Sequence, residues 1–98
     1  MSELVPTQGV RVLLVRASID DAGATYRVEL HAPEASWTGE ARLAAAIAIG
    51  PWTATRGTAP EPEPWMIESA RGFLRTLAKN HAAERDWPPR LLRWRDRR

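Results

Sequence analysis

Alternation of apolar and polar residues predicts strands in the first third of the chain. In "TYRVELHA" (25–32) every second residue from Tyr26 to Ala32 is apolar, which is the period of a strand with one buried face. The run "VRVLLVRASI" (10–19) is rich in β-branched residues, which favour strands. Between them, "DDAGA" has the Asp and Gly of a tight turn, with the glycine expected in the left-handed region. The two runs therefore predict an antiparallel hairpin.

The stretch 38–50 fits two structures. Its alanines favour a helix, whereas the apolar residues at odd positions from Leu43 to Ile49 have the period of a strand. We favour strand structure, because a lone hairpin is weakly stable and a helix this short is marginal. The pattern fits one long strand or two strands bent near 44–46, and it leaves open whether 40–49 is strand or helix.

The C-terminal half contains the clearest helix pattern. Apolar residues from Met66 onward fall within an arc of roughly 140° on a helical wheel, which predicts a core-facing helix over about 64–83. The Pro-, Gly- and Thr-rich segment 53–63 is predicted to be a loop. After the helix, "DWPP" stops it and "RLLRWR" alternates, which predicts a short strand over about 90–95.

These elements predict a single domain over 1–98 with an α+β fold in two layers. The expected sheet is antiparallel, with three to five strands, a meander at its start and a short C-terminal strand; one long helix packs on one face. A length of 98 residues, 44% apolar and 27% charged, is typical of one soluble domain. No apolar run is long enough to span a bilayer and the N-terminus lacks a signal-peptide pattern, so we expect a cytoplasmic protein without membrane contact.

The sequence indicates no catalytic centre. It contains no cysteine, which excludes disulfides and thiolate chemistry. We interpret His31 as a solvated strand residue, His81 as a cap at the helix end, and Asp20 and Asp21 as turn residues. Two separated histidines without cysteine do not provide the usual ligand set of a metal site, and no phosphate loop or nucleophile elbow is present. We therefore expect no enzyme activity, no metal and no cofactor.

Positive charge gives the only indication of a function. Residues 71–98 contain nine basic and three acidic residues, and a basic surface with nearby aromatic rings is typical of nucleic-acid binding. The candidate residues are Arg71, Arg75, Lys79, Arg90, Arg93 and Arg95. The structural alternative is a solvated helix face and a charged edge strand that prevents aggregation.

Among the five tryptophans, Trp65 lies outside the apolar arc of its helix and is a candidate interface aromatic. We expect a small binding domain whose partner is another protein or a second copy of itself in a homodimer. Nucleic-acid binding is the alternative.

Overall fold

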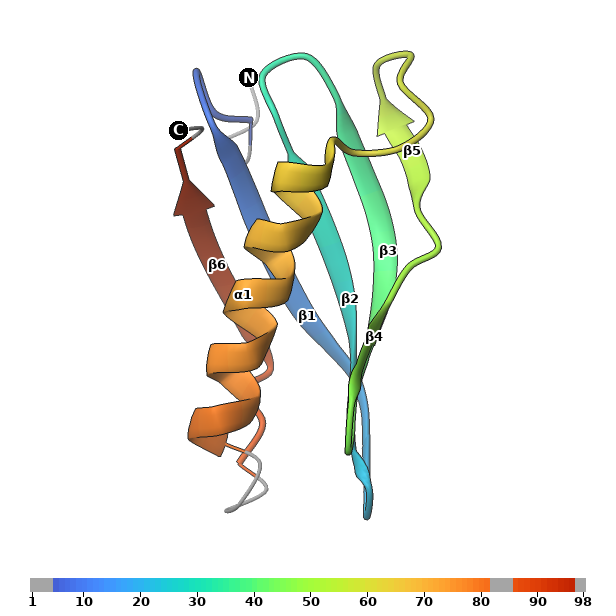
Figure 1. Cartoon of the computed structure of the whole chain (residues 1–98), viewed down its shortest axis with the longest axis vertical. Helices are drawn as coiled ribbons and strands as arrows, with labels where there is room; N and C mark the ends of the chain where they lie inside the picture. The colour runs from blue at the N-terminus through green and yellow to red at the C-terminus, as the bar shows by residue number, and fades with distance from the viewer. Residues whose placement is uncertain (1–4, 82–85, 97–98) are drawn as a thin grey trace.

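The computed structural model describes residues 5–81 and 86–96, and it consists of one antiparallel sheet and one helix (Figure 1). The elements are β1 (Val10–Asp20), β2 (Gly23–His31), β3 (Ser36–Leu43), β4 (Ile47–Ile49), β5 (Thr53–Arg56), α1 (Pro64–His81) and β6 (Arg90–Arg95). The strand order is β4-β3-β2-β1-β6, and β5 also pairs with β3. The predicted α+β fold is confirmed, but the sheet has six strands and not three to five.

The extra strands come from the middle of the chain. Strand structure over 38–50 is confirmed in place of helix, and it is divided into β3 and β4 by a turn in which the Ala44 N–H donates to the Ala46 carbonyl at 3.3 Å. The prediction of a loop over 53–63 is wrong for Thr53–Arg56, which forms β5. β5 pairs with the start of β3, so its structure comes from a sheet edge distant in sequence, which local composition does not reveal.

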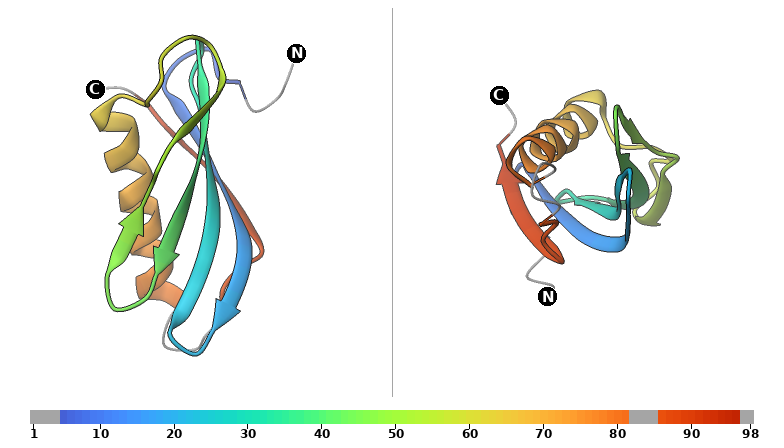
Figure 2. Two further views of the ribbon diagram at one scale, coloured as in Figure 1. Left: turned by 90° about the vertical axis from the view of Figure 1, so that its right-hand side faces the viewer. Right: turned by 90° about the horizontal axis from the view of Figure 1, so that it is seen from below.

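The core lies between the sheet and α1. α1 crosses one face of the sheet (Figure 1), and the end view shows the strands curving around it (Figure 2). In β2 the buried residues alternate as predicted, and the helix residues that meet the buried face of the sheet are Met66, Ala70, Leu74 and Leu77. Residues 82–83, where the helix was predicted to end, lie outside the described residues. Among those described, no helix combines the length and apolarity needed to cross a bilayer.

Gly23 has a steric role in the β1–β2 hairpin. The prediction of a left-handed glycine is wrong here, since Gly23 is not among the glycines with positive φ. Asp20 forms the turn as expected: its Oδ1 accepts the N–H of Ala22 at 2.9 Å and that of Gly23 at 3.0 Å. A Cβ at Gly23 would lie 1.8 Å from the Leu43 carbonyl oxygen, so glycine is needed where β2 and the end of β3 approach each other.

Tyr26 of β2 links the sheet to residues 87–88, the segment that follows α1 in the chain. Its hydroxyl donates to the Pro88 carbonyl at 2.5 Å, and its ring meets that of Trp87 edge to face with centroids 6.5 Å apart. Both residues are buried. The segment that follows the helix is thereby held against the sheet, and β6 begins next to β1.

Candidate functional site

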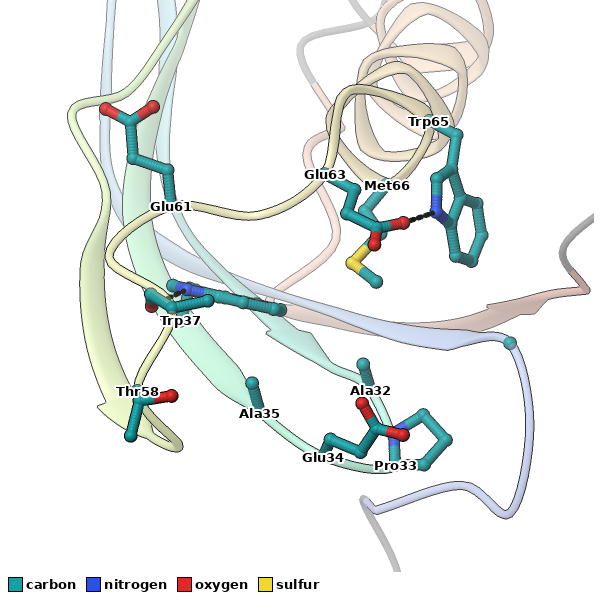
Figure 3. Close-up of a pocket in the computed structure, with 12 residues that line it drawn as sticks. Ala32, Pro33, Glu34, Ala35, Trp37, Thr58, Glu61, Glu63, Trp65 and Met66 are labelled. Atoms are coloured by element: carbon teal, nitrogen blue, oxygen red, sulfur yellow. Dashed lines mark hydrogen bonds between the residues drawn. The ribbon is translucent and has the colours of Figure 1, made fainter.

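A cleft of about 340 Å³ opens at one end of the sheet (Figure 3). It lies between the turn that joins β2 to β3, the segment 58–63 and the first turn of α1. Its volume is at the lower end of the range for small-molecule sites, so it suits a group about the size of one amino-acid side chain. The lining residues are Gly9, Ala32, Pro33, Glu34, Ala35, Trp37, Thr58, Ala59, Glu61, Glu63, Trp65 and Met66.

Two tryptophans and a methionine are among the apolar residues that line the cleft. Trp37 is buried, and its indole N–H donates to the Ala59 carbonyl at 2.9 Å, which fixes the ring beneath the segment 58–63. Trp65 lies on the opposite side, at the start of α1, and its N–H donates to Glu63 Oε2 at 2.5 Å. Met66 lies between them in Figure 3. These hydrogen bonds hold both aromatic side chains in place before any ligand arrives.

Among the described residues, the charged ones that line the cleft are all acidic. Glu34, Glu61 and Glu63 are exposed to solvent, and none of the described Lys, Arg or His residues lines the cleft. Figure 3 shows the carboxylates of Glu34 and Glu63 on opposite sides of the cavity, whereas that of Glu61 points outwards from the rim. Walls of low polarity strengthen the field of these carboxylates, so the cleft favours a positively charged group.

Arg56 of β5 holds the turn that forms one wall. Its guanidinium donates to the backbone carbonyls of Ala32, Pro33 and Ala35, the last two at 3.1 and 3.2 Å. The next residue, Gly57, has a φ of +83°, and a Cβ there would lie 2.7 Å from the Glu34 carbonyl oxygen. The chain can therefore pass closely over the turn, and the position of Glu34 depends on β5, the strand that the sequence did not predict.

The basic residues predicted on the helix lie on a flank of α1 that faces away from β6. Arg71 and Arg75 approach Glu68 at 3.5 and 3.9 Å, and Lys79 is exposed. Phe73 marks the opposite flank, since it packs beneath Arg95 of β6. At 100° per residue, Arg75 is about 200° from Phe73 around the helix axis.

The basic residues predicted on β6 are divided between the two faces of the sheet. Arg93 pairs with Val12 and Arg95 with Val10, both on the face covered by α1. Arg90 is three residues from Arg93 and is therefore on the opposite face. The structure thus does not gather the six candidate residues onto one surface, and nucleic-acid binding stays a prediction. Trp65, the predicted interface aromatic, lies in the cleft.

The interpretation of His31 as solvated is wrong. Its side chain is only 14% exposed, with Nδ1 3.0 Å from Ser36 Oγ and Nε2 3.0 Å from Glu29 Oε1. Ser36 is 2% exposed, and its Oγ also accepts the Arg56 Nε–H at 3.2 Å. A substrate has no access to a hydroxyl buried in this way, so these hydrogen bonds connect β2, β3 and β5 and do not form a nucleophilic site.

The sequence pattern did not reveal the carboxylates of the cleft. It predicted only a loop over 53–63, the segment that contains Glu61 and Glu63, although two glutamates beside a tryptophan at a helix start are a signal for a cation site. In the part of the chain that is described, no three His, Asp or Glu side chains are close enough to share a metal ion. Comparison with models of protein families, with curated proteins and with solved structures gives no match. The class is therefore defined by the fold and the cleft: a small α+β domain with an acidic, tryptophan-lined cleft.

Proposed function

We propose that the protein is a small non-enzymatic binding domain whose cleft takes a basic side chain, arginine or lysine, of a partner polypeptide. The observation that carries this proposal is the composition of the cleft. Within the part of the chain that the structure describes, it combines two tryptophans with three glutamates and includes no basic residue. A neutral apolar ligand would gain nothing from the negative charge of the cleft, and an anion would be repelled.

The two parts of the cleft suit the two parts of a basic side chain. The methylene stem packs against apolar walls such as Trp37 and Met66, while the charged head reaches the carboxylates of Glu34 and Glu63. A cation that lies over an indole face also gains electrostatic attraction, and this gain is larger when water is excluded. A planar guanidinium stacks on aromatic rings and donates to carboxylates in pairs, so arginine is expected to bind more tightly than lysine.

The test compares arginine with citrulline, which keeps the shape of arginine but has no charge. Nα-acetyl-arginine amide and Nα-acetyl-citrulline amide are titrated into the protein by calorimetry, with intrinsic tryptophan fluorescence as a second signal. We expect saturable binding of the arginine compound and at least tenfold weaker binding of citrulline. Affinity for arginine should fall as salt is added, because the carboxylates are exposed.

Matched charge variants locate the binding. Glu34→Gln combined with Glu63→Gln should weaken arginine binding at least tenfold, whereas Glu40→Gln, an exposed glutamate of β3 outside the cleft, should leave it unchanged. Equal affinity for arginine and citrulline would overturn the proposal. So would the absence of saturable binding, or equal losses in the cleft variant and the Glu40 variant.

A further inference from the structure

The two edges of the sheet differ in the length of strand that they present. At one edge, β4 and β5 share β3 and are three and four residues long. At the other, β6 has six residues, and among the described residues no strand pairs with its outer side. Figure 1 shows β6 at the margin of the sheet. A strand in this position can pair with a strand of another molecule.

Backbone hydrogen bonds establish which residues of β6 face outwards. The Arg16 N–H donates to the Pro89 carbonyl at 2.9 Å, so these residues form a hydrogen-bonded pair of the antiparallel ladder. Such pairs alternate along a ladder. In the β1–β6 register, every second residue from Leu91 onward therefore directs its backbone groups to β1. The backbone N–H and C=O groups that point to the open edge belong to Arg90, Leu92 and Trp94.

We propose that β6 pairs antiparallel with β6 of a second copy of this chain, around a two-fold axis that passes between the two Leu92 residues. In this register, Arg90 of each copy faces Trp94 of the other, and Leu91 faces Arg93. In the single chain the Leu92 carbonyl accepts a hydrogen bond from the Arg93 guanidinium at 3.0 Å. When Arg93 turns away from this oxygen, the outward groups form roughly six backbone hydrogen bonds. This inference does not depend on the proposed function, because the cleft shares no residue with β6.

Charge disfavours one of the neighbouring registers that the backbone allows. A shift by two residues would put Arg93 opposite Arg93 of the second copy, and like charges in that position destabilise a strand pair. In the proposed register, the Arg90 guanidinium meets an indole instead, which is a favourable contact. Trp94 is 45% exposed and lies on the same face of the sheet as Arg90, so its ring is available for this contact. Its indole N–H donates to the Gln8 carbonyl at 3.0 Å, which holds the ring in position.

The arrangement closes at two copies. Arg95, the remaining arginine of β6, lies over the Phe73 ring of its own chain, with its guanidinium carbon 5.2 Å from the ring centroid. The opposite edge of the sheet consists of two short strands, so it does not offer a second long edge for pairing. A two-fold contact uses the same surface of both copies, and a dimer leaves neither β6 edge unpaired.

Disulfide trapping tests the register directly, because the natural chain contains no cysteine. In the proposed dimer, the two Leu92 Cα atoms are about 5.5 Å apart, which is within the range that a disulfide spans. Under mild oxidation, Leu92→Cys should form a covalent dimer. Arg93→Cys should remain monomeric on denaturing gels, as should Ala48→Cys, an exposed position on β4 at the opposite edge.

Light scattering across a concentration series tests the dimer without crosslinking. The unchanged protein should approach twice the mass of one chain as concentration rises, and Leu92→Arg, which puts like charges on the axis, should shift the midpoint at least tenfold higher. A monomeric mass across the range would overturn the proposal. A dimer that crosslinks more readily through position 93 or 48 than through position 92 would also overturn it.

Discussion

Replacement of glycine by alanine should destabilise the fold at Gly23 and stabilise it at Gly72. A Cβ at this position would lie 1.8 Å from the Leu43 carbonyl oxygen and 2.8 Å from its carbonyl carbon. Ordinary van der Waals contact begins at 3.4 Å, so Gly23→Ala requires β2 and the end of β3 to separate by more than 1 Å. Both obstructing atoms are backbone, and no side-chain rotation relieves the contact. Overpacking of this kind costs about 1–3 kcal/mol of folding free energy or more.

The same substitution in α1 should have the opposite sign. A Cβ at Gly72 meets no atom within 4 Å, and alanine is more favourable than glycine within a helix by about 0.5–1 kcal/mol. In a domain of this size, 1 kcal/mol corresponds to a change of about 4–8 °C in Tm. Gly72→Ala should therefore raise Tm by a few degrees, and Gly23→Ala should lower it by at least that much.

Thermal and urea unfolding, followed by far-UV circular dichroism, measure both variants against the unchanged protein. Comparable m-values would show that the two variants unfold to similar states. The reasoning is refuted if Gly23→Ala is as stable as the unchanged protein. It is also refuted if Gly72→Ala is the less stable of the two variants. That result would mean that Gly23 is not the glycine in close contact and that Gly72 is not the one with free space around it.

Three further perturbations test the core and two titrating groups. Leu74→Ala, at a fully buried position of α1, should lower the free energy of unfolding by about 2–5 kcal/mol in urea titrations. Burial raises the pKa of Tyr26 above its ordinary 10.0. The stability that the protonated Tyr26 hydroxyl contributes is therefore full below pH 10 and is lost as the pH rises through the raised pKa of the folded state. Tyr26→Phe should flatten the alkaline limb of a plot of Tm against pH. The hydrogen bond from Arg42 lowers the pKa of Asp20 below 3.8. The stability that the ionised Asp20 carboxylate contributes is therefore present above pH 3.8 and is lost as the pH falls through the lowered pKa of the folded state. Asp20→Asn should flatten the acid limb of the same plot.

Residues that are close in sequence account for the predictions that the structure confirms. The alternation in β2 predicted its buried face, and Tyr26, Val28 and Leu30 are fully buried. The helix begins at Pro64 as predicted, because proline suits a first turn in which its missing N–H has no intrahelical partner. The alternating "RLLRWR" predicted β6 over 90–95 with the observed bounds.

The candidate site could not be predicted in the same way. The cleft brings together Glu34 of one turn, Trp37 of β3 and Glu63 before α1, and no local period relates these three positions. The basic residues show the converse, since they are dense in sequence but the structure distributes them over separate flanks. Charge counts along a chain do not include the direction in which each side chain points.

The sequence by itself determined the longer local elements, β1, β2 and α1, because a strand repeats every two residues and a helix every 3.6, and a buried face imposes these periods on a contiguous run. Only the tertiary structure decided the partners of those elements. It pairs β5 with β3, holds the β2–β3 turn with Arg56 and leaves β6 at an edge. These features depend on hydrogen bonds and close contacts between residues that are distant along the chain, and such contacts form only when the chain is folded.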